Sequence, residues 1–194
     1  MIIFEKQLIL SLSRDMRQII LVRHCHTGQR GTDDPGLSDG GREQAGEISG
    51  FLEAKDYEFE AVYASLYKRA IETAELLVGG QKKIIKNSAF NEYYVRSVSR
   101  EEVETTQMAA SRAMAKLYSI YDLHESVMLV LHSSIGKTVL HALLNCTYNK
   151  SLEYLNKYGE VVVLRYDWHK GDENWKVIDS FIPVQVSGEG SQSG

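Results

Sequence analysis

Short apolar runs alternate with amphipathic stretches along most of the chain, and these runs predict β-strands. Aliphatic and branched residues dominate them, as expected of strands that are buried on both faces of a sheet. The predicted strands of this kind are Ile19–Val22, Ala61–Ala64, the weaker Lys82–Lys86 and Val127–Leu131. Two further strands, Glu160–Tyr166 and Trp175–Ile182, are joined by the turn HKGDEN and predict an antiparallel pair at one edge of the sheet.

Between the strands, apolar residues recur every three or four positions, which is the spacing of a helix with one buried face. The pattern predicts helices over residues 42–55, 68–78, 100–121 and 135–144. Gly79-Gly80 ends the second helix, because glycine readily adopts the backbone conformation that follows a last helical turn. Alternating strands and helices favour an α/β fold of three α/β/α layers, with a doubly wound, mostly parallel sheet and an antiparallel edge strand.

The same pattern shows neither an internal repeat nor a linker between residues 16 and 186. We therefore expect a single domain over residues 16–186, an N-terminal extension over 1–15 and a flexible Gly/Ser-rich tail over 187–194. Charged residues interrupt the apolar start of the chain, which does not fit a signal peptide. No run of about 18 apolar residues is present to span a membrane.

Charge and cysteine content narrow the choice of partners. The net charge is −4, which disfavours general nucleic-acid binding because such domains usually carry a basic excess. The two cysteines, Cys25 and Cys146, are too few for a disulfide scaffold and favour a reducing, cytoplasmic location. We expect neither a nucleic acid nor a membrane as a partner, and the sequence leaves the oligomeric state open.

Basic and imidazole side chains gather where the predicted strands end. Arg23 and His24 follow the first strand, Arg69 lies shortly after the second, and His132 follows the strongest one. The carboxyl ends of parallel strands share one edge of a sheet, so we expect these side chains to meet there. A guanidinium fits phosphate oxygens, and a neutral imidazole can attack phosphorus. Backbone N–H groups at a helix start can hold an anion. This composition is typical of a phosphoryl-transfer pocket that stabilises charge without a metal.

Four blocks around these residues resemble motifs of the histidine phosphatase superfamily, the phosphoglycerate mutase-like enzymes. LVRHCHT is similar to the family's RHG motif, LSDGGREQA to LTxxGxxQA, VYASLYKRAIETAELL to VYSSPLxRAxQTAxxL, and VMLVLHSSI to VLVVSHGGV. The blocks follow the family's order. The chain departs from the family at Cys25 and Ser133, which each stand at a glycine of the motifs, and it lacks the family's Gly-Trp-Glu-Gly run.

The resemblance implies a role for each of the converging side chains. His24 would be the nucleophile and form a phosphohistidine that water then hydrolyses. Arg23, Arg69 and His132 would hold the phosphoryl oxygens and stabilise the transition state. The residues that would add further contacts to the phosphate or substrate are Thr27, Gln29 and Ser133.

A carboxylic acid that protonates the leaving oxygen completes the reaction that the resemblance implies. The family takes this acid from the loop after the third strand, where Phe90-Asn91-Glu92 stands, and we assign the role to Glu92. Glu101 and Glu102 are the alternatives, although their positions also fit charges in the first turn of the following helix.

We therefore expect a metal-independent phosphomonoester phosphatase that needs no cofactor and acts on a small phosphorylated metabolite. A phosphoprotein or phosphohistidine-protein substrate is the first alternative. The next are a phosphoglycerate-type mutase and a module that binds phosphorylated ligands without turnover. The short stretch between Glu92 and His132 favours hydrolysis, because a mutase must shield its phosphohistidine from water.

Two rival interpretations use the residues beside His24. Cys25 and Arg30 resemble the loop of cysteine-based phosphatases, but one residue fewer separates them than in that motif. His24 and His26 lie on the same face of an extended strand and could begin a metal site, but the sequence has no further Cys/His cluster to complete four ligands. Neither interpretation gives Arg69 a role.

Overall fold

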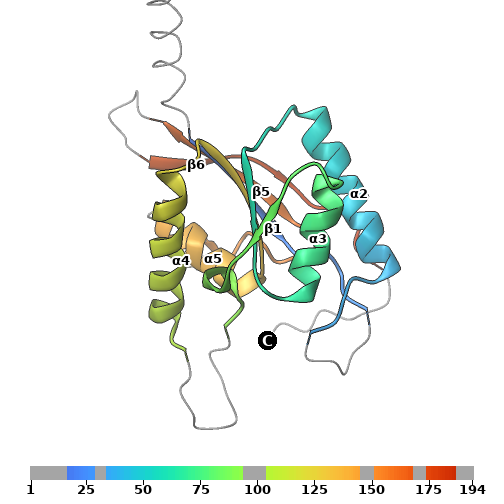
Figure 1. Ribbon diagram of the computed structural model, residues 1–194, viewed down its shortest axis with the longest axis horizontal. Helices are drawn as coiled ribbons and strands as arrows, with labels where there is room; N and C mark the ends of the chain where they lie inside the picture. The colour runs from blue at the N-terminus through green and yellow to red at the C-terminus, as the bar shows by residue number, and fades with distance from the viewer. Residues whose placement is uncertain (1–16, 29–33, 94–103, 145–150, 168–173, 187–194) are drawn as a thin grey trace, which may run out of the picture.

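A mixed sheet of six strands in the order β3-β2-β4-β1-β5-β6 runs through the protein (Figure 1). The structure is a computed structural model that describes residues 17–28, 34–93, 104–144, 151–167 and 174–186. The mutually parallel strands are β1 (Gln18–Arg23), β2 (Ala61–Ala64), β3 (Ile84–Lys86) and β4 (Ser126–Leu131). β5 (Val161–Asp167) is antiparallel to both of its neighbours, β1 and β6 (Asn174–Phe181). The predicted sheet with an antiparallel edge pair is thus confirmed.

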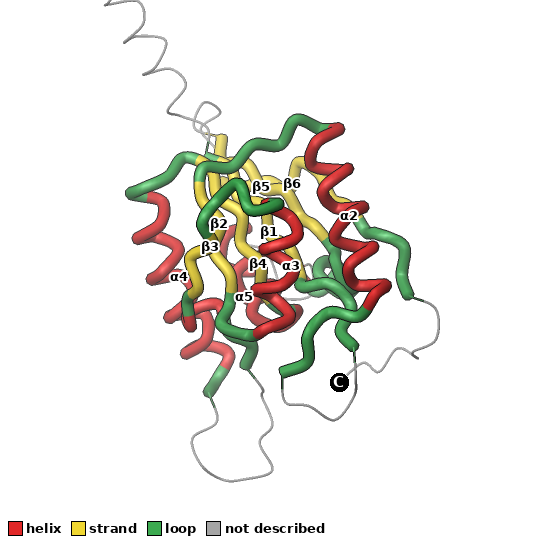
Figure 2. The backbone as a smooth tube through the Cα atoms, turned by 45° about the vertical axis from the view of Figure 1, so that its right-hand side comes forward, coloured by secondary structure: helices red, strands yellow, loops and turns green. Residues whose placement is uncertain are grey.

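Helices cover both faces of the sheet and make the three predicted layers (Figure 2). They are α2 (Asp39–Ala54) and α3 (Lys68–Val78) on one face, and α4 (Thr106–Tyr121) and α5 (Ser133–Leu144) on the other. The alternation along β1 shows why both faces are apolar. Ile19 and Leu21 join the core under α4 and α5, while Ile20 and Val22 join the core under α2 and α3.

Capping side chains account for the helix starts that the sequence pattern misplaced. α2 begins at Asp39, not at residue 42, because the side chain of Ser38 accepts the N–H of Gly41. α4 begins at Thr106, because Thr105 caps it through the N–H of Met108. The sequence pattern predicted that residues 104 and 105 are helical, and they are not. Residues 100–103 of the same predicted helix lie outside the described part.

Other elements differ from their predicted bounds by a few residues. α5 already starts at Ser133, two residues before the predicted start. β3 is shorter than the predicted strand and covers only its last three residues, Ile84–Lys86. A short 3-10 helix, η1 (Ser88–Phe90), stands in the segment expected to be a loop, and the side chain of Asn87 caps it. The predicted extension and tail, residues 1–15 and 187–194, lie outside the described residues.

The two central strands send the chain to opposite faces of the sheet. β1 leads into α2 and β4 leads into α5, so a crevice opens between them at their carboxyl ends. Their register pairs Arg23 with Leu131, and the N–H of His24 donates to the carbonyl oxygen of Leu131 at 2.9 Å. This pairing places His24 and His132 side by side at the crevice.

None of the helices in the described part of the chain is both long and apolar enough to cross a membrane.

The start of α2 packs closely against the segment that follows β1, and this contact gives a test of the fold. A Cβ at Gly41 would overlap the carbonyl oxygen of His26, so Gly41→Ala should lower the free energy of unfolding by about 1–3 kcal/mol. Urea unfolding measures it. Gly46 is the matched control, because a Cβ there meets only open space and alanine is the better helix former. Gly46→Ala should therefore stabilise the protein by about 0.5–1 kcal/mol. Equal effects of the two substitutions would contradict this packing.

Candidate active site

His24 stands at the end of β1 as a buried, uncharged imidazole. Its side chain is 7% exposed, and its Nδ1 lies 2.9 Å from the backbone oxygen of Cys25. A carbonyl oxygen can only accept, so Nδ1 carries the hydrogen and Nε2 keeps its lone pair. Burial lowers the pKa of His24 to about 3, although the bond to Cys25 acts in the opposite direction. At neutral pH, Nε2 is therefore ready to act as a nucleophile.

His132 is the second imidazole of the crevice, with its ring centroid 5.1 Å from that of His24. Its Nε2 lies 2.7 Å from the hydroxyl oxygen of Ser65, a fully buried residue at the end of β2. Its Nδ1 is buried and has no hydrogen-bond partner among the described residues. Burial lowers the pKa of His132, and so do the charges of its neighbours. A buried nitrogen without a partner costs free energy that a polar ligand would recover.

The two predicted arginines each lie against a tyrosine ring beside these histidines. The guanidinium carbon of Arg23 is 4.3 Å from the ring centre of Tyr158, and that of Arg69 is 4.5 Å from the ring centre of Tyr67. Arg69 also pairs with Asp34 through a 3.1 Å contact to a carboxylate oxygen. Tyr158 orients the planar guanidinium of Arg23. Tyr67 and Asp34 together orient that of Arg69.

The sequence analysis predicted that four basic or imidazole groups would meet, and the structure brings them together. After burial, the charges of Arg23 and Arg69 are among the causes that lower the pKa of both His24 and His132. Two cations beside two neutral imidazoles make a site in which an anion is favoured and a cation repelled. The arrangement suits a phosphoryl group, whose oxygens can take the guanidinium donors while Nε2 of His24 faces phosphorus.

Glu92, the predicted acid, contacts the start of α5. Its two carboxylate oxygens accept the N–H groups of Ser134 and Ile135, each at 3.1 Å. The sequence analysis assigned anion binding to backbone N–H groups at this helix start, and two of them, those of Ser134 and Ile135, bind the carboxylate of Glu92. Burial lowers the pKa of Arg23, and the charge of Glu92 partly offsets this effect, which places the carboxylate near the arginine cluster.

Arg112 on α4 fixes the segment that carries Glu92. Its guanidinium donates to the backbone oxygens of Ala89 at 2.6 Å and Asn91 at 2.8 Å. The carboxylate of Glu104 accepts from the same guanidinium at 2.5 Å and 2.8 Å. Arg112 therefore ties the loop after β3 to α4 and orients the candidate acid without contacting it.

Two of the three additional predicted contacts, Thr27 and Ser133, lie among the described residues. Thr27 forms a backbone β-bridge with Leu37. The hydroxyl of Ser133 donates to the backbone oxygen of Leu155 at 2.9 Å and so anchors a neighbouring turn. Gln29 lies outside the described residues, as do Glu101 and Glu102, the alternative acids.

The geometry does not support the thiol of Cys25 as a nucleophile. The side chain is fully buried, and burial raises the pKa of the thiol to about 12. A reactive cysteine needs the opposite shift, since the thiolate is the attacking form. For the metal interpretation, the described part of the chain contains no group of three His, Cys, Asp or Glu side chains placed to hold an ion.

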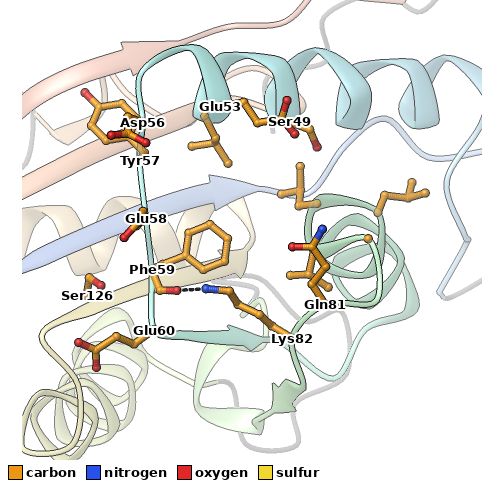
Figure 3. Close-up of a pocket in the computed structure, with 15 residues that line it drawn as sticks. Ser49, Glu53, Asp56, Tyr57, Glu58, Phe59, Glu60, Gln81, Lys82 and Ser126 are labelled. Carbon is orange, nitrogen blue, oxygen red and sulfur yellow. Dashed lines mark hydrogen bonds between the residues drawn. The ribbon is translucent and has the colours of Figure 1, made fainter.

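A cavity of about 690 Å³ lies at the opposite edge of the sheet, by the amino ends of β2 and β4 (Figure 3). Tyr57, Phe59 and Lys82 line it, and the ammonium of Lys82 donates to the backbone oxygen of Phe59. None of the clustered histidines and arginines borders it. A smaller cavity of about 360 Å³ lies near the histidine side, where Gly28, Asp34 and other residues line it. Size alone therefore does not locate the chemistry.

Comparison with known proteins relates part of the chain to one protein family. Residues 19–98 match the sequence model of the histidine phosphatase superfamily (branch 1). The match covers less than half of the chain, and it is this part, residues 19–98, that is similar to the superfamily. One curated relative is the 2,3-bisphosphoglycerate-dependent phosphoglycerate mutase of Parvibaculum lavamentivorans, which is 36% identical over 87 residues. That match spans 38% of this chain and only 40% of the mutase.

Solved structures of other proteins share the fold over most of this chain. The YhfR protein of Bacillus stearothermophilus is 23% identical, with a TM-score of 0.68 over 84% of this chain and 95% of that chain. A putative phosphohistidine phosphatase SixA from Agrobacterium tumefaciens is 18% identical, with a TM-score of 0.64 over 86% of this chain and 99% of that chain. At these identities the likeness concerns the fold.

Sequence reasoning missed several residues that shape the site. Ser65 lies inside the block that leads to Arg69, so its place next to β2 was a usable signal for a partner of His132. Asp34 and Tyr158 come from segments without motif resemblance, and only the folded chain brings them to the arginines.

Burial of His24 predicts how stability depends on pH. The pKa of His24 falls from 6.5 in the unfolded chain to about 3 in the folded protein. Below pH 6.5 the unfolded chain binds a proton that the folded chain rejects, so stability falls as the pH drops towards 3. The loss reaches about 1.4 kcal/mol per pH unit for this group.

Urea unfolding between pH 7.5 and 5 should show a shallower fall in the free energy of unfolding for His24→Asn than for the unmodified protein. Identical slopes for His24→Asn and the unmodified protein would contradict a buried neutral imidazole.

Proposed function

We propose that the protein hydrolyses phosphomonoesters through a phosphohistidine on Nε2 of His24. The observation that carries the proposal is the hydrogen bond from Nδ1 of His24 to the carbonyl of Cys25, which leaves Nε2 unprotonated beside His132, Arg23 and Arg69. A fixed tautomer and a preorganised cluster of donors are what a phosphoryl-transfer site requires.

The reaction takes two displacements at phosphorus. In the first, the lone pair of Nε2 forms the N–P bond while the bond from phosphorus to the ester oxygen breaks, and that oxygen receives a proton from Glu92. In the second, water attacks phosphorus, gives its proton to the Glu92 carboxylate, and the N–P electron pair returns to His24. The guanidinium groups of Arg23 and Arg69 neutralise the phosphoryl oxygens in both steps. Before the first step one oxygen of Glu92 gives up its N–H contact at α5 and takes up a proton, which comes from solvent in the first cycle and from the attacking water of the second displacement in later cycles.

The proposed substrate is a small phosphorylated metabolite, and the enzyme works without a metal or cofactor. The site supports this class because its charges match a single phosphoryl group and are supplied by the chain itself. Phosphoprotein hydrolysis uses the same chemistry at the same histidine. A screen that includes small phosphate esters and a phosphohistidine-bearing protein separates the two, since each reports release of inorganic phosphate.

Mutase activity is the second candidate function, and the partial match to the Parvibaculum lavamentivorans phosphoglycerate mutase favours it. A mutase returns the phosphoryl group of His24 to a substrate oxygen, whereas a phosphatase gives it to water. Phosphorus NMR of 3-phosphoglycerate incubated with the protein distinguishes the products, which are the isomeric phosphoglycerate in one case and inorganic phosphate in the other.

Removal of the nucleophile tests the proposed hydrolysis. With p-nitrophenyl phosphate, His24→Ala should lower kcat by at least about 10³-fold, because no other group in the cluster can form the phosphoenzyme. Release of nitrophenolate between pH 5 and 8 measures the rate. Cys25→Ala is the matched control at the adjacent position, and it should keep most of the activity because the thiol is buried and protonated. Loss of activity in Cys25→Ala with retention in His24→Ala would move the nucleophile to the thiol.

The acid role of Glu92 is tested by the leaving group. Glu92→Gln should slow alkyl phosphates by about 10²–10⁴-fold and nitrophenyl phosphate much less, since nitrophenolate leaves without protonation. Rates for a series of esters with leaving groups of increasing pKa give a slope for each protein. Glu153→Gln, at an exposed glutamate, should reproduce the original slope. An equal slowing of all esters by Glu92→Gln would remove Glu92 as the acid and leave it the role of capping α5.

A further inference from the structure

We propose that Glu160 is a positioning residue that holds Arg23 in the phosphate site through the turn Leu155–Lys157. The inference rests on the proposed function, because it concerns the same phosphoryl-binding arginine. Neither the motifs nor the assigned roles include Glu160, which lies just before β5 and is only 3% exposed. A carboxylate so far from solvent needs partners that compensate for its lost hydration.

The partners of Glu160 are three consecutive backbone N–H groups. One carboxylate oxygen accepts from Leu155 at 2.7 Å, and the other accepts from Asn156 at 2.8 Å and Lys157 at 3.0 Å. Successive N–H groups that converge on one anion form a nest, which binds negative charge through oriented dipoles. The turn is thus folded around the carboxylate, and its shape depends on Glu160.

The opposite side of the same peptide groups faces Arg23. Its Nη1 donates to the carbonyl oxygens of Asn156 at 2.5 Å and Leu155 at 3.3 Å. Each of two peptide units therefore has its N–H on the Glu160 carboxylate and its C=O on the Arg23 guanidinium. Peptide dipoles lined up between an anion and a cation polarise one another, which strengthens both sets of hydrogen bonds. Loss of the anion would loosen the carbonyls that orient the arginine.

The backbone of the turn is strained, which makes its dependence on these bonds stronger. Leu155 has a φ of 58°, in the left-handed region that costs a residue with a side chain about 1–2 kcal/mol. The hydroxyl of Ser133 adds a bond to the carbonyl of Leu155, so the start of α5 also supports the turn. A conformation of this cost persists only where the surroundings hold it.

The turn reaches the nucleophile as well as the arginine. The N–H of Gly159 donates to the carbonyl oxygen of His24 at 3.2 Å, and the N–H of Arg23 donates to that of Glu160 at 2.9 Å. The ring of Tyr158, between these residues, supports the guanidinium of Arg23 and lies 5.5 Å from the ring of His24. Within the described part of the chain, the carboxylate of Glu160 accepts its hydrogen bonds from its own turn, and its charge also acts on Arg23. The residue acts through Arg23 and not on the substrate.

Binding of inorganic phosphate tests the inference without requiring turnover. Isothermal calorimetry on the full chain should show that Glu160→Gln weakens phosphate binding by about tenfold, because the amide replaces an acceptor with a donor that faces the N–H groups of the turn. With p-nitrophenyl phosphate, KM should rise and kcat/KM should fall by a similar factor. Glu153→Gln, an exposed change in the same segment, should leave phosphate affinity unaltered.

A double-mutant cycle separates positioning from general destabilisation. Combined with Arg23→Gln, Glu160→Gln should change phosphate affinity by less than about twofold, since the arginine through which it acts is gone. An equal loss in both backgrounds would overturn the inference. Circular dichroism checks folding, and if Glu160→Gln does not fold, Glu160→Asp takes its place in the same cycle, because it keeps the charge with one carbon fewer. Coupling to Arg23 would again support the inference, and additivity would overturn it.

The cycle also keeps this inference apart from the proposed hydrolysis. Phosphate binding coupled between Glu160 and Arg23 in a protein that hydrolyses no ester would support the positioning role and overturn the proposed function. Hydrolysis by the unmodified protein with uncoupled phosphate binding would do the reverse. Absence of phosphate binding to the unmodified protein would overturn both.

Discussion

The parallel pairing of β1 with β4 is the constraint on which the site depends. Arg23 pairs with Leu131, and the next residue on each strand is a histidine, so a backbone hydrogen bond sets two imidazoles beside each other. A shift of one residue in this register would turn every side chain of β1 to the other face and destroy both halves of the core. The apolar alternation that stabilises the sheet therefore also aligns the reactive residues, and the fold and the site share one cause.

Burial then sets the chemistry of the aligned groups. Desolvation lowers the pKa of His24 and of His132 and raises the pKa of the Cys25 thiol. The same physical effect therefore leaves the imidazoles neutral and the thiol protonated. The guanidinium groups lie at the same depth, in contact with tyrosine rings, carbonyl oxygens and Asp34. The result is a positively charged site with two neutral imidazoles, an arrangement that suits a phosphoryl dianion.

The sequence predicted the layers, the edge pair and the convergence of His24, His132, Arg23 and Arg69, since all of these follow from local periodicity and from the rule that strand ends meet. Helix starts were missed where a capping hydroxyl, such as that of Ser38, extends a helix beyond its apolar pattern. Asp34 and Glu160 were missed for another reason. Asp34 bonds to Arg69, which lies 35 residues further along the chain. Glu160 holds a turn whose contacts with Arg23 span 132 and 133 residues. No short motif encodes contacts over such separations.

Glu92 links the chemistry of the site to the integrity of α5. As an anion it accepts the N–H groups of Ser134 and Ile135 in the first turn of the helix, whereas the proposed mechanism also requires it to carry a proton during part of each turnover. Folding and catalysis thus make opposite demands on one carboxyl group. Sequence changes that cap α5 by other means would release Glu92 for proton transfer. Changes that strengthen the hydrogen bonds of Glu92 to α5 would raise the stability of the protein and lower its turnover rate. We therefore expect substitutions in the first turn of α5 to change the turnover rate as much as substitutions around the proposed nucleophile do.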